Sequence, residues 1–490
     1  MRRLEGLSNV FVLFPIVFPF IAAVAVSTIK FRNEKWRNIF IIFSVIINFI
    51  SIILILNTEG LVAFHLWTVN NFLDIYFKID EMGIFFSILA SILWIFTAFY
   101  AIDYMKHEGR EKIFFVFFIL TLGITVGIAF SGNLFTLYIF YELLTLATFP
   151  LVIHSGSKEA LDSGKKYLIY SFGGATLILL GMILLFSINS NMDFVARGVL
   201  SGAVENANLI SIVYALMFLG FGVKAAIVPF HSWLPGAMVA PTPVSALLHA
   251  VAVVKSGIFA IIRISYFIFG AEIVRETHDN IYLSILIVIT ILLGSLLALH
   301  QENLKKRLAY STISQLGYIL LGIILLNENA LIGGLLHLVN HAVIKITLFF
   351  CAGAIYFTTG KKNISDIRGI GRKMPVTMWC FAIAAISLIG IPPTNGSVSK
   401  WYLALGGLNA NKILFVVILL LSAFLTAAYL LPIVIAAFFP GGDKVENESR
   451  VEPPPRMLIP IVMLTGVVVF LGFFPNAVLS FIGEIVRMVI

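Results

Sequence analysis

The stretch FGVKAAIVPFHSWLP, from Phe221 to Pro235, indicates what kind of fold the chain adopts. It continues an apolar run that begins near Ser211, yet it carries Lys224 and, five residues later, Pro229. A lysine is costly in the centre of a bilayer, and a proline removes a backbone donor and disrupts a helix. Together they predict a functional site in a broken membrane helix, where water or neighbouring groups satisfy the free carbonyls.

The composition of the chain supports a membrane fold. Of its 490 residues, 60% are hydrophobic and 12% are charged, and the mean hydropathy is +1.02. A soluble protein carries about twice that charged fraction. Runs of about 20 apolar residues, the length of a helical span, recur along the chain. Runs this uniformly apolar are typical of helices and not of barrel strands. The sequence therefore predicts an all-α polytopic membrane protein.

We predict fourteen transmembrane spans. The weakest boundary is the one between the fourth and fifth spans, and the twelfth span is interrupted by glycines and prolines. The ranges are 8–29, 38–57, 82–104, 113–131, 133–153, 166–188, 209–231, 243–268, 281–299, 306–326, 330–357, 375–405, 412–439 and 457–482.

The distribution of basic residues predicts the orientation of these spans. The loops that follow odd-numbered spans hold 21 Lys and Arg residues, and those that follow even-numbered spans hold 4. By the positive-inside rule the odd loops face the cytoplasm, so both termini lie outside. Residues 58–81 alternate around Asn70 and predict an external hairpin, whereas the polar stretch 441–456 predicts a cytoplasmic linker.

Ionisable residues inside the predicted spans are the candidate site. Burial disfavours the charged forms of lysine and carboxylate, which lets both exchange protons near neutral pH, and histidine does so unaided. His337, His341 and Lys345 are spaced four apart and share one helix face. A proton path is therefore the favoured interpretation. The full set is Glu142, Lys224, His249, Lys255, His337, His341, Lys345 and Lys400.

These residues also have alternative explanations that do not involve proton transfer. A single buried lysine can snorkel or form a structural pair. His337 and His341 have a spacing that suits zinc, but no third ligand is evident. Arg263 and His300 lie near span ends, and we expect them at the membrane interface. The two cysteines are expected to be packing residues, and because nucleotide and iron–sulfur motifs are missing from the sequence, no cofactor and no catalytic centre are expected.

Helix breakers recur in the second half of the chain. Lys400 follows Gly390, Pro392, Pro393 and Gly396, so the breaks fall in spans seven and twelve. This offset of five predicts two five-helix repeats, which an odd number of helices inverts in the membrane. The predicted units are residues 1–112 with three helices and the hairpin, 113–268 as the first repeat (helices 4–8), 281–439 as the second repeat (helices 9–13), and 440–490 as linker and last helix.

Long sequence blocks resemble a known family. FGVKAAIVPFHSWLPGAMVAPTPVSALLHAVAVVKSGIFAIIR, KKRLAYSTISQLGYI, LHLVNHAVIKITLFF and GIPPTNGSVSKWYL occur in the order found in antiporter-like proton-pumping subunits. These subunits belong to the membrane arm of respiratory complex I, to Mrp-type sodium/proton antiporters and to membrane-bound hydrogenases. With lysine at position 400, the chain looks closest to the D-type Mrp subunit and its counterpart in hydrogenase-type complexes.

The resemblance implies roles for individual residues. Glu142 and Lys224 would be the glutamate of the fifth helix and the lysine of the seventh, and Lys255 the connecting lysine of the eighth. His337, His341 and Lys345 would form the central relay, and Lys400 would be the lysine of the far half-channel. The chain would then be a non-catalytic, ion-translocating subunit in the plasma (inner) membrane of a prokaryote.

The function predicted on these grounds is proton translocation within a multisubunit complex, either redox-driven or of the Mrp type. The expected partners are other membrane subunits, the lipid bilayer and protons. A peripheral redox module and sodium are left open, and no nucleic acid is expected. The alternatives are a stand-alone secondary transporter of a cation or solute, and a scaffold that has lost pumping. The set Glu142, Lys224, Lys255, Lys345 and Lys400 argues against the scaffold.

Overall fold

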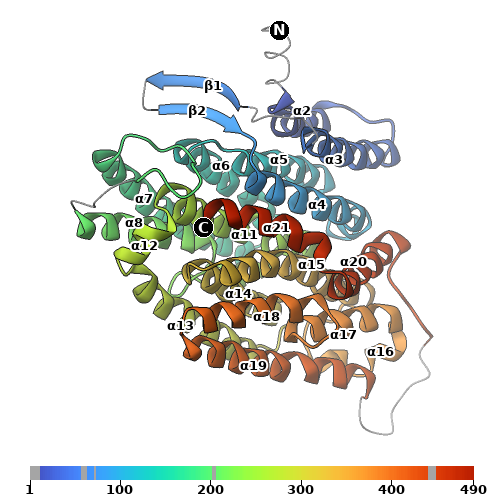
Figure 1. Ribbon diagram of the computed structural model, residues 1–490. Helices are drawn as coiled ribbons and strands as arrows, with labels where there is room; N and C mark the ends of the chain where they lie inside the picture. The colour runs from blue at the N-terminus through green and yellow to red at the C-terminus, as the bar shows by residue number, and fades with distance from the viewer. Residues whose placement is uncertain (1–10, 57–62, 71–72, 201–205, 440–448) are drawn as a thin grey trace.

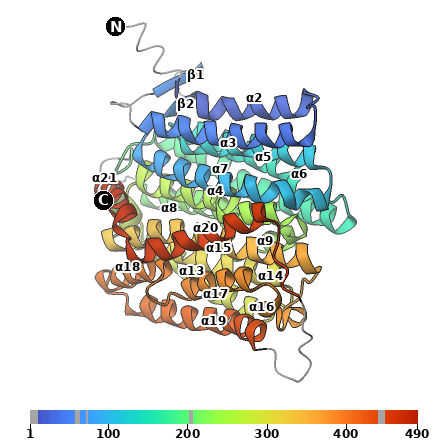
Figure 2. The same ribbon diagram turned by 90° about the vertical axis from the view of Figure 1, so that its right-hand side faces the viewer.

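The computed structural model describes residues 11–56, 63–70, 73–200, 206–439 and 449–490. Its helices lie side by side in a stack that follows the chain, with the first half above the second (Figures 1 and 2). The last two helices leave this order and return to the middle of the stack, where both contact α15. The predicted all-α, multi-pass membrane fold is confirmed.

The N-terminal part contains three helices and the predicted hairpin. Its two strands form an antiparallel sheet in which Phe64 pairs with Phe77. The predicted hairpin is therefore present, while Asn71 at its turn lies outside the described residues. The elements are α2 (Phe14–Thr28), α3 (Glu34–Leu56), β1 (Ala63–Asn70), β2 (Leu73–Lys78) and α4 (Glu81–Glu108).

The next segment corresponds to the first predicted repeat. Polar side chains begin several of its helices, and Asn133 and Ser157 accept from the N–H groups of Thr136 and Ala160. The elements are α5 (Glu111–Ala129), α6 (Leu134–Val152), α7 (Lys158–Ile188), α8 (Ala207–Lys224), α9 (Trp233–Gly236), η1 (Ala237–Val239), α10 (Thr242–Ala250), α11 (Val253–Arg263), the π-helix η2 (Ile264–Ile268) and α12 (Ala271–Glu276).

The remaining elements complete the bundle. Asn303 and Asn327 cap two of its long helices through their side-chain oxygens. The elements are α13 (Asp279–Leu299), α14 (Leu304–Ile324), α15 (Glu328–Thr359), η3 (Ser365–Ile367), α16 (Ile370–Lys373), α17 (Pro375–Ile389), α18 (Asn395–Asn409), α19 (Ile413–Phe438), α20 (Pro455–Phe473) and α21 (Asn476–Val489).

Not every predicted span is a long apolar helix. Within the described ranges, eleven helices, with α10, α11 and η2 counted as one, are long and apolar enough to cross a membrane, and α2 and α17 are shorter apolar helices. Each of the fourteen predicted ranges contains a helix, but the count of fourteen is not confirmed. The last predicted span is in fact two helices, because α20 ends at Phe473 and α21 begins at Asn476. Of the predicted linker before α20, residues 441–448 lie outside the described residues.

Both predicted interruptions are visible as breaks between helices. α8 ends at Lys224 and the short α9 begins at Trp233, with Pro229 between them. α17 ends at Ile389 and α18 begins at Asn395, and this break contains Pro392 and Pro393. Each break therefore leaves backbone carbonyls without a helical partner close to a lysine.

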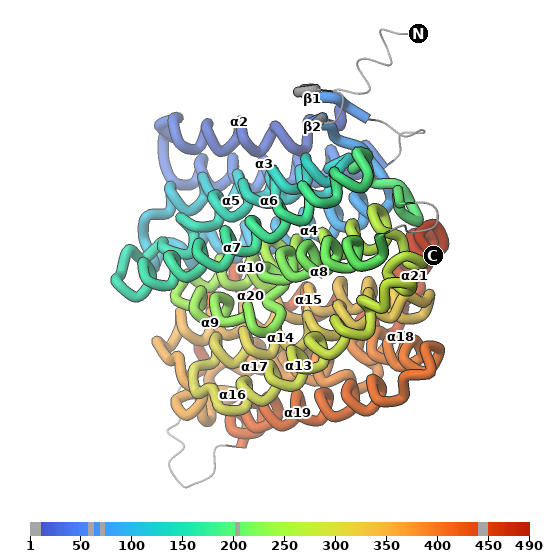
Figure 3. The backbone as a smooth tube through the Cα atoms, turned by 90° about the vertical axis from the view of Figure 1, so that its left-hand side faces the viewer, coloured from blue at the N-terminus to red at the C-terminus, as the bar shows by residue number. Residues whose placement is uncertain are grey.

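The core of the stack is formed by two central elements. In the 18-residue apolar stretches of 242–268 and of α15, 100% of the residues are buried. In the corresponding stretches of α3, α19 and α20, 33% are buried. Figure 3 shows α10 and α15 in the middle of the stack, with α2 and α19 at its opposite ends. The outer helices thus present apolar faces outward, and the fully enclosed helices are those that carry most of the candidate residues.

The expectation that Arg263 lies at the interface is wrong. The residue is 0% exposed, and its guanidinium donates two hydrogen bonds to the carboxylate of Asp80. The rings of Phe194, Phe259 and Phe267 surround it. The ion pair ties the end of α11 to the start of α4, which satisfies a charge that lipid would not tolerate. His300, by contrast, is exposed.

Candidate functional site

The centre of the site is a direct contact between the two buried elements. Lys255 of α11 and His341 of α15 are both fully buried, and Lys255 Nζ lies 3.0 Å from His341 Nδ1. Lys255 also donates to the carbonyl oxygen of His249 at 3.1 Å. Two residues 86 positions apart in sequence therefore form one hydrogen-bonded unit in the core.

His337 continues this unit along α15. Its Nδ1 lies 2.9 Å from Ser399 Oγ, and its Nε2 donates to Gln315 Oε1 at 3.1 Å. The ring centroids of His337 and His341 are 6.0 Å apart. Because both ring nitrogens of His337 are already engaged, coordination of zinc through either nitrogen would have to break a hydrogen bond. Nor does any group of three metal-binding side chains occur among the residues described.

Lys345 lies one turn beyond His341 and points to a different helix. It donates to the carbonyl oxygen of Leu308 at 2.9 Å and to the hydroxyl of Ser311, both in α14. The three residues of the predicted face thus lie on one buried helix, but their partners come from α11, α14 and α18. The α15 face therefore connects three neighbouring helices through hydrogen bonds.

Lys400 occupies the second broken helix. Its ammonium donates to the carbonyl oxygens of Leu388 at 2.7 Å and Ile389 at 2.8 Å, where the partial negative charge of the α17 C-terminus favours a cation. It also lies 5.1 Å from the ring centroid of Tyr318, and that ring lies 5.4 Å from the ring of His337. Tyr318 therefore bridges the space between Lys400 and the α15 face.

Lys224 ends α8 and is buried against α6. Its ammonium donates to the carbonyl oxygen of Tyr141 and lies 3.4 Å from the centroid of that ring. Glu142 is the next residue, and its charge and that of Lys224 interact electrostatically. In the described part of the chain, however, no ion pair joins them, and Glu142 Oε1 is buried without a hydrogen-bond partner.

Lys224 and the central unit are in contact through backbone packing and not through a hydrogen bond. A side chain at Gly257, two residues after Lys255, would place its Cβ 2.7 Å from the Ala225 nitrogen. Helices α8 and α11 therefore meet closely beside Lys224.

His249, whose carbonyl oxygen accepts from Lys255, has an unpartnered side chain: both of its ring nitrogens lack a partner among the described residues. A buried imidazole with two free nitrogens is costly unless water or a proton donor reaches it.

Several polar residues of the site were missed by sequence reasoning, which considered ionisable residues alone. Asn340 donates to the carbonyl oxygen of Asn395 at 2.7 Å, and the Asn395 amide donates back to Asn340 Oδ1 at 3.0 Å. Gln315, Ser399 and Tyr318 are the other additions. An uncharged polar side chain inside an apolar helix was the available signal, because it also needs a partner there.

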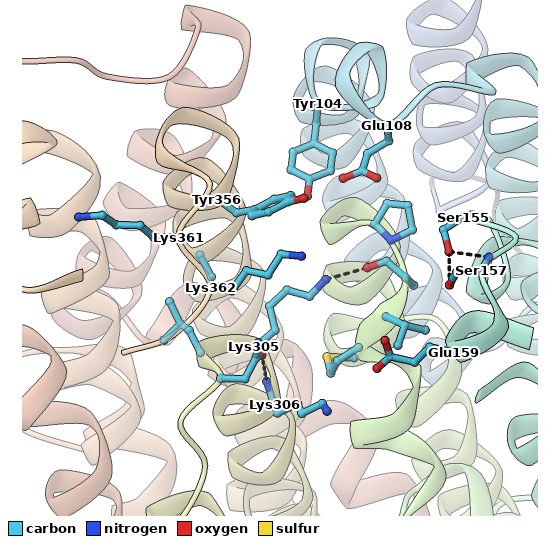
Figure 4. A pocket seen from close by; sticks show the side chains of 17 residues that line it. Tyr104, Glu108, Ser155, Ser157, Glu159, Lys305, Lys306, Tyr356, Lys361 and Lys362 are labelled. Atoms are coloured by element: carbon cyan, nitrogen blue, oxygen red, sulfur yellow. Dashed lines mark hydrogen bonds between the residues drawn. The ribbon is translucent and has the colours of Figure 1, made fainter. Parts of the chain in front are cut away.

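A cavity of about 390 Å³ opens beside this core on the face that holds the basic loops (Figure 4). The side chains of Lys305, Lys362 and Glu108 project into it. Lys305 donates to the carbonyl oxygen of Ala240 at 2.7 Å, and the same oxygen accepts from Ser245 at 3.2 Å. His249 lies one helical turn after Ser245. The carbonyl oxygen of Ala240, a residue of the cavity wall, thus connects Lys305 to the helix that carries His249.

The chain is similar in sequence to known proteins. Residues 131–426 match the family described as "NADH:quinone oxidoreductase/Mrp antiporter, TM". The chain is 35% identical to NADH-quinone oxidoreductase subunit N of Desulforudis audaxviator, over 80% of this chain and 82% of that protein. It is 28% identical to the D-type subunit of the Na(+)/H(+) antiporter of Alkalihalophilus pseudofirmus, over 96% of both proteins.

Two solved structures share the fold. A chain of the Mrp complex from Dietzia sp. DQ12-45-1b superimposes with a TM-score of 0.87 at 23% identity, covering 99% of this chain and 97% of that one. A chain of respiratory complex I from Thermus thermophilus gives a TM-score of 0.74 at 20% identity, covering 95% of this chain and 98% of the other.

Proposed function

Because the chain belongs to the NADH:quinone oxidoreductase/Mrp antiporter transmembrane family, we propose that it is a proton-translocating, antiporter-like subunit of a multisubunit membrane complex. The observation that carries this proposal is the row of buried polar side chains through the core. Lys255 and His341 are hydrogen-bonded, His337 follows, and the ring of Tyr318 leads to Lys400. Ionisable side chains are costly inside a membrane, so a connected row of them indicates a functional role such as proton transfer.

In the proposed path, protons enter from the cavity at Lys305 and reach the core through His249. Lys255 and His341 pass them to His337, and Lys400 releases them on the opposite side. The cavity supports this entry because Lys305 at its wall and Ser245, one helical turn before His249, donate to the same carbonyl oxygen. Lys345 is a further proton-holding site at the junction with α14.

Glu142 and Lys224 act as the switch in this proposal. Glu142 directly follows Tyr141, whose carbonyl oxygen and ring are the contacts of the buried Lys224 ammonium, and the two charges interact without an ion pair. Their protonation is therefore coupled and belongs to the pair. Charge movement in a neighbouring subunit would weaken the pair and free the proton of Lys224 to move towards Lys255.

The relatives support two types of complex. The relatives are subunits of NADH-quinone oxidoreductases and of Na(+)/H(+) antiporters, and both types support other membrane subunits as partners. We propose the plasma membrane of a prokaryote as the location. We also propose that 113–268 and 281–439 are inverted repeats, which is supported by one broken helix in each.

The test of function is proton translocation in vesicles, with the assembled complex compared with this chain alone. The assembled complex should acidify or alkalinise the vesicle interior when its driving reaction is supplied, and the isolated chain should not. Ion exchange by the isolated chain at the rate of the complex would instead establish the stand-alone transporter.

Orientation provides a separate prediction. Single cysteines replace Lys361, in the basic loop after α15, and Leu66 in β1, both exposed positions, in a variant without the two native cysteines. An impermeant thiol reagent added to intact cells should label position 66 and not position 361, because basic loops stay inside. Labelling of position 361 alone would reverse the proposed topology.

A further inference from the structure

Helix α20 packs directly on the break beside Lys400. The contact is made at Gly472, near the end of α20, where an added Cβ would lie 2.0 Å from the carbonyl oxygen of Pro393 and 2.8 Å from Thr394 Cα. Real Cβ atoms essentially never approach a neighbour to less than 3.0 Å. The neighbouring atoms belong to the backbone, so any side chain at position 472 would displace the break itself.

The backbone of this break also determines where Lys400 lies. The two carbonyl oxygens that accept from its ammonium belong to Leu388 and Ile389, directly before the break. Gly390 follows with φ +97°, and a Cβ there would lie 2.7 Å from Lys400 Cδ. The contact at Gly472 is therefore a few residues away from the groups that hold the ammonium.

The same break is hydrogen-bonded to the helix that carries the histidines. Asn395, which starts α18, exchanges two hydrogen bonds with Asn340 of α15, and Asn340 lies between His337 and His341 in sequence. Among the described residues, the titratable side chains that interact with Lys400 are Tyr318 of α14 and His337 of α15. A shift of the break would thus move Lys400 relative to both of them.

The segment before α20 holds the other end of α17. Glu452 accepts hydrogen bonds from the Val376 nitrogen at 2.7 Å and the Thr377 hydroxyl at 2.6 Å, where a carboxylate also suits the positive end of the helix. One continuous segment, 449–473, therefore contacts the start of α17 through Glu452 and the break that follows α17 through Gly472.

We propose that Gly472 is a positioning residue for Lys400, and that segment 449–473 clamps α17 so that its terminal carbonyls hold the Lys400 ammonium. This inference rests on the proposed proton translocation. It adds that the C-terminal segment, which carries none of the eight candidate residues, determines the geometry of the proton release site.

Three variants of the assembled complex test the clamp: Gly472→Ala, Gly466→Ala and Lys400→Ala. Gly466 is the matched control, because it lies on the same helix and an added Cβ there meets nothing within 4 Å. Gly472→Ala should lower the translocation rate about tenfold or more, since small misplacements of reacting groups have effects of this size. Its pH profile should also be displaced, whereas Gly466→Ala should match wild type in rate and profile.

The outcomes separate this inference from the proposed function. A normal rate in Lys400→Ala overturns the proposed function. If Lys400→Ala is impaired but Gly472→Ala translocates at the normal rate, the clamp alone is overturned. The clamp is also overturned if Gly472→Ala is slower at every pH by the same factor, with its pH optimum unchanged. If Gly472→Ala fails to assemble, Glu452→Gln replaces it, because it weakens the other end of the clamp without crowding. A wild-type pH profile in Glu452→Gln then overturns the proposal.

Discussion

Replacing Lys224 by alanine should lower proton translocation by the assembled complex about 100-fold, the lower end of what a positioned proton-transfer group contributes. The expected loss follows from the isolation of this side chain. Its ammonium is buried against α6 and contacts a single carbonyl oxygen and one ring, both of Tyr141. No neighbouring described group stands ready to replace it next to Glu142. Assembly should persist, because alanine removes a charge from the core and adds none.

Lys224→Arg makes the result specific. Arginine keeps the positive charge and stacks well on an aromatic ring, but it stays protonated at any relevant pH. A purely structural cation would therefore tolerate arginine, whereas a group that must release its proton would not. We expect Lys224→Arg to be as inactive as Lys224→Ala.

The matched control for these variants is Lys165→Ala, which removes a lysine whose side chain is 74% exposed and should leave the rate unchanged. Translocation is measured as the initial rate of pH change in vesicles, normalised to the amount of complex. Wild-type rates in both Lys224 variants would show that this lysine is not part of the proton path.

Sequence patterns predicted the helices and the breaks because both depend on local chemistry. A run of apolar residues must form a helix in lipid, and prolines and glycines interrupt it wherever they occur. The break at 390–394 was therefore visible from its own residues. The division of the last predicted span into two helices at Pro475 was not predicted, although a proline is a common start of a new helix.

The pairing of residues could not be predicted in the same way. The contact between Lys255 and His341 depends on how α11 packs against α15, and nothing in either helix specifies its neighbour. Arg263 shows the limit most clearly. Its place near a span end suggested the interface, but Asp80, far away in sequence, provides a carboxylate partner that lets the guanidinium be buried. Gly472 likewise appeared ordinary until the opposing backbone was known.

The link between Lys255 and His341 gives the second large effect. Lys255→Ala or His341→Ala should each abolish nearly all translocation, because each removes one side of the 3.0 Å contact in the middle of the row. If protons pass through the two residues in series, the second substitution removes nothing further. The double variant should therefore be no slower than either single variant, in the way that residues acting as a unit are non-additive.

This non-additivity distinguishes a series path from two independent contributions. Independent residues would multiply their separate losses in the double variant, as distant sites do. Thr347→Ala offers a control, because Thr347 is on the same buried helix and its hydroxyl donates to the carbonyl oxygen of Val343 in its own α15. Its rate should be close to wild type. If the fold-loss of the double variant relative to wild type equals the product of the two single fold-losses, Lys255 and His341 lie on separate routes through the core.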